Sequence, residues 1–375
     1  MKMLVISAYP SSLVNFRGDL LRRLSNNGVS VTALSSGASD SEIKEILTVA
    51  EHYQDYKVSR NGINPVEDIF VIFRFVRLYL KLKPDSIFAY TIKPVIFGSI
   101  AARLTGIKNF NALITGLGFG FQKGSWKKNV LVSIVTFLYR FALKNARTVT
   151  FQNKDNLDYF IKNKIVDKRK CFLVNGSGVN LERFTPAEKQ TSSSKFLLIA
   201  RLLGDKGIRE YARAAELTQI KYPSAEFHLV GPEDPSPNGI SHEEVMKWHN
   251  QGTVVYHGAQ SDVRPFIAET GVFVLPSYHE GLPRTVLEAM AMAKPILTTD
   301  VPGCCETVVN NDNGWLVEKA NAEALSEKMC WFIENEQRSL DMGQRSLEMA
   351  KNKFDVHKVN TELLKILKVR DEETV

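Results

Sequence analysis

Short apolar runs rich in β-branched residues alternate along the chain with longer segments in which apolar residues recur at helical spacing. Met3–Ser7 predicts a buried strand, and residues 13–27 predict a helix that ends at Gly28. Strands separated by helices indicate βαβ units, and therefore a parallel sheet covered on both faces. The further strands predicted in this half are 29–34, 86–90, 111–115 and 148–152, and the further helices are 65–83, 94–104 and 125–145.

The same alternation starts again at residue 195, after the polar, aperiodic segment 186–194 that we interpret as a linker. A chain of 375 residues exceeds what one core usually supports, which favours two domains. The predicted strands of the second half are 195–200, 225–230, 254–256, 272–275, 295–299 and 315–317, and the helices are 207–221, 284–293 and three near 321–335, 337–351 and 356–369.

We therefore expect an α/β fold of two doubly wound, parallel-sheet, Rossmann-like domains that face an interdomain cleft. The expected boundaries are 1–186 for the N-terminal domain and 187–350 for the C-terminal domain. Residues 351–375 are expected to form a C-terminal helix that packs back towards the N-terminal domain.

The charges divide unevenly between the two halves. Residues 1–190 hold 28 Lys and Arg against 14 Asp and Glu, a net charge of +14, whereas the other 20 basic and 27 acidic residues leave the second half at −7. The segment 101–150 has eight basic residues and no acidic one. This asymmetry indicates an anionic partner for the first half.

Several classes of protein are disfavoured by composition. The chain is 44% apolar and 24% charged, as in ordinary globular proteins, and no uncharged apolar stretch reaches about 18 residues. No secretory signal pattern is evident at residues 1–9. The four cysteines form no Cys-x-x-Cys pair, so we expect buried, reduced thiols in a cytoplasmic protein.

Arg201 and Lys206 follow the predicted strand 195–200 directly, in the sequence Ala-Arg-Leu-Leu-Gly-Asp-Lys-Gly. Two cations at a helix N-terminus suit a diphosphate, because the helix dipole also favours negative charge there. The alternative is a solvated loop that ends in an ordinary helix cap. Gly231, which follows strand 225–230, is by itself a weaker signal, because glycines at strand ends are usually turns.

Glu280 and Glu288 flank the start of the predicted helix 284–293. On helical geometry, eight residues separate the two carboxylates by about 80° and about 12 Å, so they cannot share one proton. We expect Glu280 to lie at the strand tip near the chemistry and Glu288 to accept hydrogen bonds from a diol. The alternative is a helix-start charge and a surface glutamate. The apolar residues 289–293 disfavour a solvated Glu288.

The sequence lacks the motifs that are typical of dinucleotide binding and of metal binding. Gly116-Leu-Gly118-Phe-Gly120 has the wrong spacing for a dinucleotide fingerprint, although it suits a cleft-lining loop. The chain contains no Asp-x-Asp and no His-Glu-x-x-His, so we expect no metal cofactor.

Two helices of the first half combine apolar residues with cations. Trp126, Lys127 and Lys128 open the segment 125–147, and Arg74 and Arg77 share a face of the predicted helix 65–83. The functional interpretation is a surface that docks on anionic lipid headgroups. The alternative is two core helices with snorkelling cations. Nucleic acid is not expected, because no recognised motif is present.

At the level of motifs, the chain resembles the retaining glycosyltransferases of family 4, which have the GT-B architecture. The second half carries the Glu-x7-Glu pair Glu280/Glu288. The first half is similar to transferases of polysaccharide and glycan assembly, including those that add N-acetylhexosamine to undecaprenyl-diphosphate-linked sugars. The matching stretches are ARLLGDKG (200–207), FHLVG (227–231), VFVLPSYHEGLPRTVLEAMAMAKPILTTDVPGCCE (272–306), NGWLV (313–317), VNFRGDLL (14–21), YTIKPVIFGSIAARLTG (90–106) and ITGLGFGF (114–121).

The resemblance implies a role for each matching residue. Arg201 and Lys206 would stabilise the departing diphosphate, Glu280 would contact the transferred sugar, and Glu288 would bind the ribose. The remaining implied donor-binding residues are Gly281, Leu282, Pro283, Gly231 and Gly18, the last at the mouth of the cleft. The implied acceptor-binding residues are Asn15, Arg17, Lys93, Thr115, Gly116 and Gly118.

Two departures from the family pattern stand out. The glycine-rich or acidic donor loop of many relatives is replaced by residues 11–18, and Thr115-Gly116 stands where a histidine is common. A histidine-assisted mechanism is therefore disfavoured.

The implied function is retaining, metal-independent transfer of GalNAc or GlcNAc from a UDP-sugar to a lipid-diphosphate-linked sugar, in assembly of a bacterial surface polysaccharide such as capsule or O-antigen. The implied location is the cytoplasmic face of the inner membrane, with peripheral attachment to anionic lipid. One alternative is a UDP-sugar epimerase of the same fold, which would need no acceptor. The other is an inert nucleotide-sugar-binding protein at the membrane, which would form no product.

Overall fold

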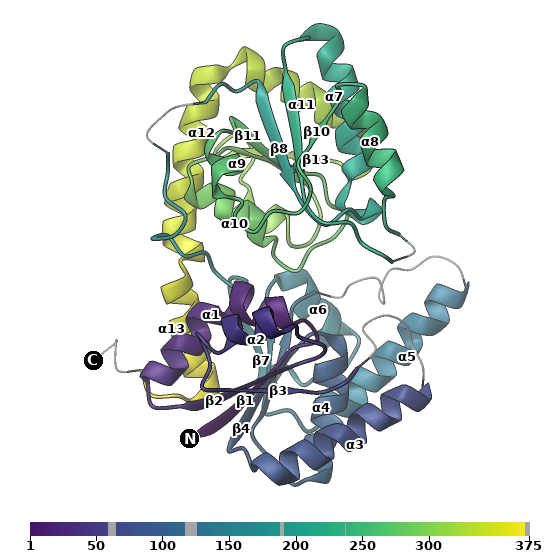
Figure 1. Ribbon diagram of the computed structural model, residues 1–375, viewed down its shortest axis with the longest axis vertical. Helices are drawn as coiled ribbons and strands as arrows, with labels where there is room; N and C mark the ends of the chain where they lie inside the picture. Colours follow the sequence, from purple (N-terminus) through teal and green to yellow (C-terminus); the bar gives the residue numbers. More distant parts are fainter. Residues whose placement is uncertain (59–64, 117–125, 188–190, 237, 372–375) are drawn as a thin grey trace. The chain divides into compact units, whose positions relative to one another are not determined.

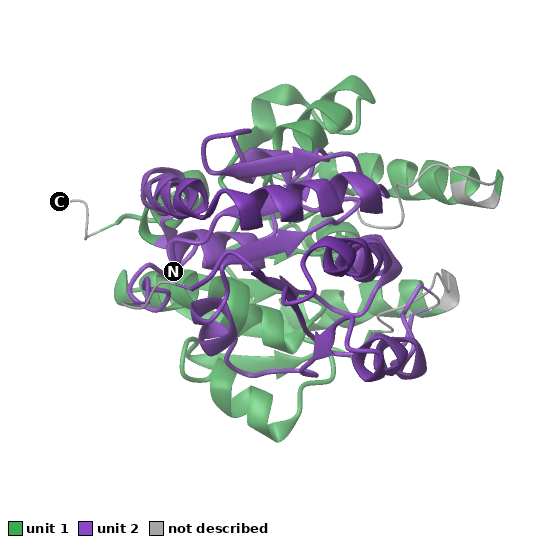
Figure 2. Ribbon diagram, turned by 90° about the horizontal axis from the view of Figure 1, so that it is seen from above, with its two compact units in different colours: residues 1–177, 357–375 green, residues 178–356 purple. Residues whose placement is uncertain are grey.

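The computed structural model describes residues 1–58, 65–116, 126–187, 191–236 and 238–371. The chain divides into two compact units, coloured separately in Figure 2. Unit 1 comprises residues 1–177 and 357–375, and unit 2 comprises residues 178–356. Each unit is built around its own parallel sheet.

The sheet of unit 1 has seven strands in the order β3-β2-β1-β4-β5-β6-β7. All its pairings are parallel, with Val5 opposite Phe88 in the central β1–β4 pair. The inner strands are short, buried apolar runs, as expected for a sheet covered on both faces. The strands are β1 (Lys2–Ile6), β2 (Ser30–Ser35), β3 (His52–Asp55), β4 (Ser86–Tyr90), β5 (Phe110–Ile114), β6 (Thr148–Phe151) and β7 (Cys171–Leu173).

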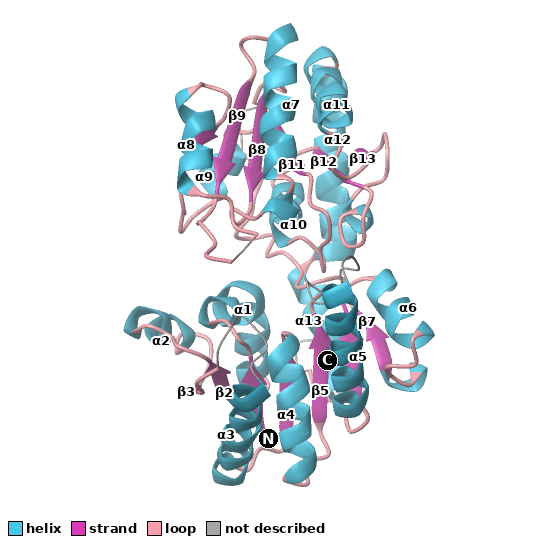
Figure 3. Ribbon diagram, turned by 90° about the vertical axis from the view of Figure 1, so that its right-hand side faces the viewer, coloured by secondary structure: helices cyan, strands magenta, loops and turns pink. Residues whose placement is uncertain are grey.

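Helices cover both faces of this sheet (Figures 1 and 3). On one face, α3 packs against α4 and α4 packs against α5. The other face is covered by α1, α2 and the C-terminal helix α13, whose Leu363 and Leu364 are fully buried in the same core as Leu20 of α1. The helices are α1 (Pro10–Asn26), α2 (Asp40–Ile46), α3 (Pro65–Leu82), α4 (Ile92–Leu104), α5 (Trp126–Leu143), α6 (Lys154–Lys162) and α13 (Val356–Leu367).

Unit 2 repeats the plan with a six-stranded parallel sheet in the order β10-β9-β8-β11-β12-β13. One core lies beneath α7, α8 and α11, and a second lies beneath α9 and α10. The strands are β8 (Lys195–Ile199), β9 (Glu226–Val230), β10 (Val255–Tyr256), β11 (Val272–Leu275), β12 (Ile296–Thr299) and β13 (Gly314–Val317). The helices are α7 (Ile208–Lys221), α8 (His242–Asn250), α9 (Arg264–Ala268), α10 (Arg284–Ala291), α11 (Ala322–Glu334) and α12 (Glu336–Met349).

The unit boundaries differ from the expected 186/187 and 350/351. Val179 and Phe184 are buried in the unit 2 core, so the segment before the polar linker already belongs to unit 2. Ala350 and Phe354 are fully buried in the same core. The chain therefore returns to unit 1 only at residue 357.

Two further expectations can be compared with the described residues. The four cysteines are free, but Cys304 is the one that is buried, whereas Cys171, Cys305 and Cys330 are half-buried. The expectation that all four are buried was therefore wrong. In the part of the chain that the structure describes, no helix is long and apolar enough to cross a lipid bilayer.

Candidate active site

The topology of unit 2 marks one position as a natural binding site. Strands β9 and β10 lie on one side of β8, and β11 to β13 lie on the other. The loops after β8 and β11 therefore leave the sheet in opposite directions and open a crevice at their carboxyl ends. Residues of both loops carry the charged groups that the sequence singled out.

The loop after β8 is fixed by a glycine. Gly207 has a φ of 70° and is the N-cap of α7. A Cβ at this position would lie 2.0 Å from the carbonyl oxygen of Pro276, which follows β11. The same two loops are joined by the Tyr278 N–H, which donates to the Asp205 carbonyl at 2.8 Å. Only a residue without a side chain therefore allows this approach.

Lys206 and Glu280 meet where these two loops come together. The Lys206 Nζ lies 2.5 Å from Glu280 Oε1, and the two side chains are 19% and 14% exposed. Both charges are thus partly withdrawn from water, yet still reachable by a ligand. A diphosphate that entered the crevice could take over the lysine from the carboxylate, because phosphate oxygens bind ammonium groups strongly.

Arg201, also in the loop after β8, forms a second ion pair. Its Nη1 lies 2.6 Å from Asp234 Oδ2, and its side chain is 55% exposed. Burial by itself would raise the pKa of Asp234, but hydrogen bonds from Ser236 and the charge of Arg201 lower that pKa below its usual range. Sequence reasoning missed Asp234, although its place just after β9 and Gly231 was a usable signal.

Gly231 lies close to the backbone of the β8 loop. Its added Cβ would stand 1.8 Å from the Ala200 carbonyl oxygen. This close approach gives the glycine a packing role beside Arg201. It does not itself show contact with a ligand.

Glu280 is held in place by the loop after β12. Its N–H donates to the Pro302 carbonyl at 3.1 Å. A Cβ on Gly303 would lie 2.5 Å from the Glu280 carbonyl oxygen, so this position also requires glycine. The Glu280 backbone is therefore fixed from two sides.

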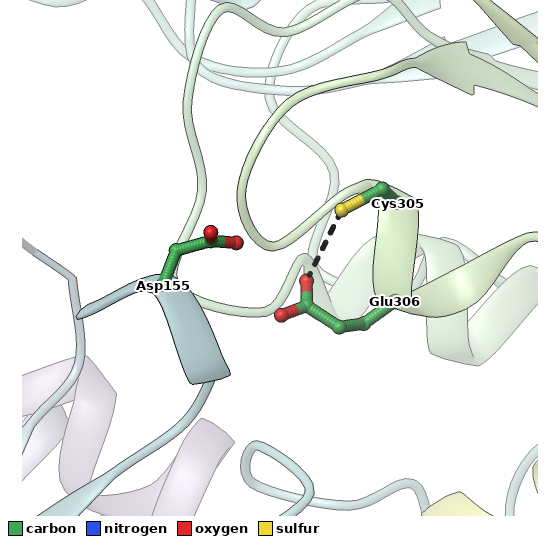
Figure 4. Close-up of side chains that lie close together, drawn as sticks. All are labelled: Asp155, Cys305 and Glu306. Atoms are coloured by element: carbon green, nitrogen blue, oxygen red, sulfur yellow. Dashed lines mark hydrogen bonds between the residues drawn. The ribbon is translucent and has the colours of Figure 1, made fainter. Parts of the chain in front are cut away.

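The same β12 loop continues into Glu306. Its carboxylate accepts a hydrogen bond from the Gly303 N–H at 2.7 Å, and Cys305 Sγ lies 3.8 Å from it (Figure 4). Beside this pair, burial raises the pKa of the Cys304 thiol to about 12, with Glu280 adding to the shift. The buried thiol is thus protonated at neutral pH.

Glu280 and Glu288 do not lie on one helix. Pro283 is the N-cap of α10 and Arg284 is its first residue, so Glu280 belongs to the preceding loop. The helical separation expected for the two carboxylates was therefore wrong. Gly281 and Leu282 are half-buried in this loop, and Pro283 is buried.

Glu288 lies on α10 and is buried, at 7% exposure. Arg284 Nε is 2.8 Å from its Oε1. Burial raises the pKa of Glu288, and the charges of Arg284 and Arg183 act against this rise. The sequence expectation that Glu288 is not a solvated residue is confirmed.

At the corresponding switch of unit 1, between β1 and β4, hydroxyl groups predominate. The Ser12 hydroxyl lies 2.6 Å from the Ser7 hydroxyl and 3.2 Å from the Tyr90 hydroxyl. The Ala8 N–H donates to Thr91 Oγ1 at 3.2 Å, which joins the loops after the two strands.

The predicted residues of α1 are divided between surface and interior. Asn15 is exposed, whereas Arg17 is 2% exposed and lies over the Tyr90 ring at 5.6 Å. A group this buried cannot contact an acceptor unless the helix rearranges. Gly18 is also buried, but an added Cβ would meet Val49 only at an ordinary contact distance of 3.7 Å.

The other expected acceptor residues lie at two further strand ends. Lys93, on α4 after β4, has its Nζ 2.9 Å from Asp68 Oδ1 of α3. Thr115 and Gly116 follow β5 and are half-buried. Gly118 lies outside the described residues. The structure thus places Lys93 in the first turn of α4, and Thr115 and Gly116 in the segment after β5.

The outer faces of α3 and α5 expose large apolar side chains. Phe73 is 64% exposed and Trp126 is 72% exposed. Arg74 and Arg77 are exposed on α3, and Arg74 Nη1 donates to the Lys57 carbonyl. The side chains of Lys127 and Lys128 lie outside the described residues. We call the following set the α3–α5 surface: Ile69, Phe70, Phe73, Arg74, Arg77 and Leu80 of α3, and Trp126, Val130, Ile134, Phe137, Arg140 and Phe141 of α5.

Comparison with known proteins agrees with this geometry. The family model described as "Glycosyl transferases group 1" matches residues 181–349, and the model described as "Glycosyl transferase 4-like" matches residues 8–153. The chain is 31% identical to the N,N'-diacetylbacillosaminyl-diphospho-undecaprenol alpha-1,3-N-acetylgalactosaminyltransferase of Campylobacter jejuni. That match covers 79% of this chain and 80% of the relative.

A second relative is the UDP-Gal:alpha-D-GlcNAc-diphosphoundecaprenol alpha-1,3-galactosyltransferase of Escherichia coli. It is 28% identical, over 68% of each chain. Among solved structures, Anabaena HepE in complex with UDP and glucose superposes with a TM-score of 0.79 at 16% identity. The superposition covers 99% of this chain and 100% of the other. At that identity the structural likeness establishes the fold alone.

Two doubly wound units, with cations and carboxylates at the switch of the second, define a protein of GT-B fold. The chain belongs to the family of glycosyltransferases that carry the group 1 domain. The fold class and the family resemblance expected from the sequence are thereby confirmed. The roles of the individual site residues stay predictions.

Proposed function

We propose that this glycosyltransferase moves GalNAc or GlcNAc from a UDP-sugar to a lipid-diphosphate-linked sugar, with retention of configuration and without a metal ion. The observation that carries the proposal is the Lys206–Glu280 pair at the topological switch of unit 2. A cation beside a carboxylate suits a donor that has a diphosphate at one end and a sugar at the other.

The proposed leaving-group chemistry uses the two cations. Lys206 and Arg201 would leave their carboxylate partners, Glu280 and Asp234, and stabilise the charge that develops on the departing UDP. Glu280, released from the lysine, would hydrogen-bond the transferred sugar. Because these cations can supply the stabilisation, the reaction would need no bound metal.

The proposed transfer step occurs on one face of the sugar. The bond between the anomeric carbon and the diphosphate oxygen breaks, and a bond to the acceptor oxygen forms on the same face. The acceptor proton passes to the departing diphosphate. A covalent route through two carboxylates would need them about 5 Å apart, flanking the sugar. Glu288, buried on α10 and paired with Arg284, is poorly suited to that role.

The relatives support the proposed donor and acceptor classes. The Campylobacter jejuni relative is named for N-acetylgalactosaminyl transfer to a diphospho-undecaprenol-linked sugar, and the Escherichia coli relative for transfer from UDP-Gal to such an acceptor. A relative from Staphylococcus aureus is named for capsular polysaccharide biosynthesis. We therefore propose a role in the assembly of a bacterial surface polysaccharide.

We propose that unit 1 docks on anionic lipid at the cytoplasmic face of the inner membrane through the α3–α5 surface. Nine of its side chains are exposed and apolar or aromatic, and they lie alongside Arg74, Arg77 and Arg140 in the set defined above. Apolar groups can enter the headgroup region while the cations meet lipid phosphates. A lipid-linked acceptor would require such a location.

The proposed activity is tested by a donor screen against synthetic undecaprenyl-diphosphate sugars. The assay scores UDP release and the mass of the lipid product. We expect release to require both a UDP-N-acetylhexosamine and the lipid acceptor. Conversion of a UDP-sugar without acceptor would indicate an epimerase instead, and UDP binding without any product would indicate an inert binding protein.

Membrane docking is tested by vesicle flotation with neutral and with anionic lipid. We expect flotation with anionic vesicles, and a loss of it in Phe73→Ala/Trp126→Ala and in Lys127→Ala/Lys128→Ala. Ile220→Ala is the matched control, because Ile220 is 80% exposed in unit 2. Flotation that is independent of anionic lipid would contradict this part of the proposal.

A further inference from the structure

Arg284 and Glu288 form an ion pair one turn apart on α10, in which Glu288 is buried and Arg284 is half-buried. Arg284 Nε is 2.8 Å from Glu288 Oε1, and the two side chains are 14% and 9% exposed. Apart from Thr285, the rest of the helix is apolar, with Val286, Leu287 and Met290 fully buried. An ion pair on a buried helix is weak evidence for stability, because desolvation of two charges offsets their attraction. Its presence here calls for a functional explanation.

Burial of Glu288 favours its neutral form, whereas the positive charges around it favour its ionised form. Burial raises the pKa of the carboxyl group, whereas Arg284 and then Arg183 lower it. Arg284 comes from the same helix, and Arg183 comes from the segment that precedes β8. Of the two, Arg284 is the one with a hydrogen bond to the carboxylate.

The chemical need for an ionised Glu288 follows from the ligand. The ribose of a nucleotide presents two adjacent hydroxyls, and each can donate one hydrogen bond. A carboxylate only accepts, through about four lone-pair sites, whereas a protonated carboxyl also donates and loses part of this capacity. An arginine that occupies one oxygen from its Nε leaves other lone pairs open.

We propose that Arg284 is a positioning residue that holds Glu288 as an oriented carboxylate for the two ribose hydroxyls of a nucleoside diphosphate. This inference rests on the proposed function, because it takes the ligand of unit 2 to be a UDP-sugar. Arg284 itself need not touch the ligand. It acts through the charge and the orientation of Glu288.

The competing explanation is that the pair only stabilises α10. A purely structural pair would affect thermal unfolding but would not distinguish ligands that differ only in their ribose hydroxyls. The decisive quantity is therefore the ratio of dissociation constants for 2′,3′-dideoxy-UDP and UDP. Isothermal titration calorimetry of the full chain measures both.

We expect the wild type to bind UDP at least tenfold more tightly than 2′,3′-dideoxy-UDP, because two hydrogen bonds to a charged group are lost. Glu288→Gln should bring this ratio close to one. Arg284→Gln should reduce it several-fold by weakening UDP binding, while the affinity for the dideoxy compound changes little. Arg284→Lys, which keeps the charge but lacks the planar fork, should restore part of the ratio.

A second readout is the pH dependence of the ratio. In the wild type, the preference for UDP should be present at neutral pH and should be lost as the pH falls through the pKa of Glu288. Without the charge of Arg284 that pKa rises further, so the loss in Arg284→Gln should begin at higher pH. Arg213→Gln is the matched control, because Arg213 forms an exposed pair with Glu216 on α7 of the same unit.

The outcomes separate the two levels of the proposal. If Arg284→Gln keeps the wild-type ratio at every pH while its melting temperature falls, the pair is structural and the inference is overturned, whereas the proposed function stands. If the wild type binds UDP but does not distinguish the dideoxy compound, the ribose role of Glu288 fails, and this inference with it. If the wild type binds neither compound, the proposed function itself fails. Should Arg284→Gln not fold, Arg284→Met, which also removes the charge but keeps an apolar stem, takes its place, and an unchanged ratio in that variant would overturn the inference.

Discussion

The two units have the same doubly wound plan but place opposite chemistry at their switch points. In unit 2, the loops after β8 and β11 bring together Lys206 and Glu280, both charged and partly exposed. In unit 1, the ends of β1 and β4 and the start of α1 bring together the hydroxyls of Ser7, Tyr90 and Ser12. The fold alone therefore does not determine which ligand is bound.

The cations show the same difference. Arg201 of unit 2 is 55% exposed beside its strand end, whereas Arg17 of unit 1 is buried against Tyr90. The cations that unit 1 does expose on α3 and α5 accompany exposed apolar side chains rather than a strand end. Unit 2 thus exposes a cation beside a strand end, whereas unit 1 exposes cations beside apolar side chains on two helices.

The largest effect is expected when the charge of Lys206, at the switch point of unit 2, is removed. Lys206→Met should lower kcat by about 10²- to 10³-fold, because one charge that stabilises the leaving group is lost. Initial rates of UDP release measure this. Lys221→Met is the matched control, since Lys221 pairs with Glu334 on the surface of the same unit. Equal rates for Lys206→Met and the wild type would remove Lys206 from the reaction.

The next prediction tests the contact between the loops after β8 and β11 of unit 2, where Gly207 lies against Pro276. Gly207→Ala should lower the free energy of unfolding by about 3 kcal/mol, because the new Cβ would overlap the Pro276 carbonyl oxygen. Gly252→Ala has a similar positive φ but no atom within 4 Å, so it should cost only about 1 kcal/mol. Chemical denaturation measures both variants. Equal losses would show that the backbone angle matters and the loop contact does not.

Substitution of Arg17 is expected to affect mainly stability, and substitution of Arg201 mainly activity. Arg17→Ala should lower the free energy of unfolding by about 2 kcal/mol, because a buried side chain and its contact with Tyr90 are removed. Arg201→Ala should change it by no more than about 0.5 kcal/mol, while raising KM or lowering kcat. Denaturation and steady-state kinetics on both variants give the four values. A stable but inactive Arg17→Ala would assign Arg17 to the site instead.

The last prediction concerns a buried lysine of unit 2, whose effect appears only at alkaline pH. Burial lowers the pKa of Lys294 to about 8, while its Nζ donates to the carbonyls of Ala268 and Thr270. The folded state therefore loses the lysine proton before the unfolded state does. Its contribution makes stability rise with pH between about 8 and about 10.5, by up to roughly 3 kcal/mol.

Lys294→Met should lack this rise. The check is the difference between the unfolding free energies of wild type and variant across that pH range. A difference that does not vary with pH would show that Lys294 keeps an ordinary pKa.

The sequence predicted the long periodic elements of the fold well. Helices α3, α5 and α7 and the central strands agree with the expected segments to within a few residues. The short helices α2, α6, α8 and α9 were not predicted, because they are too short for a clear period. The edge strands β3 and β7, of four and three residues, carry no continuous buried run.

The unit boundaries could not be predicted because they depend on tertiary contacts. The polar segment 186–194 looks like a linker, but Val179 and Phe184 before it are buried in unit 2. The helix α13 lies in the core of unit 1 through Val359, Leu363 and Leu364, in the domain towards which residues 351–375 were expected to pack. Hydrophobic periodicity shows that these residues are buried but not in which core.

The candidate site was predicted in part. The strand-end positions of Arg201, Lys206 and Glu280 followed from the pattern of strands and loops. Two ion-pair partners did not, because Asp234 becomes a neighbour of Arg201, and Arg284 a neighbour of Glu288, only through side-chain geometry. The burial of Arg17 also escaped the pattern, since a basic residue on an amphipathic helix is usually exposed.

The central claim is that the protein transfers a sugar with retention of configuration. In this account the cations of unit 2, and not a metal ion, stabilise the departing diphosphate. The measurement that tests it most directly is the anomeric configuration of the product formed in the presence of EDTA, determined by nuclear magnetic resonance. The account predicts an α-linked product from an α-linked UDP-sugar, at a rate that EDTA leaves unchanged. A β-linked product, or activity that disappears with EDTA and returns with a divalent cation, would contradict it.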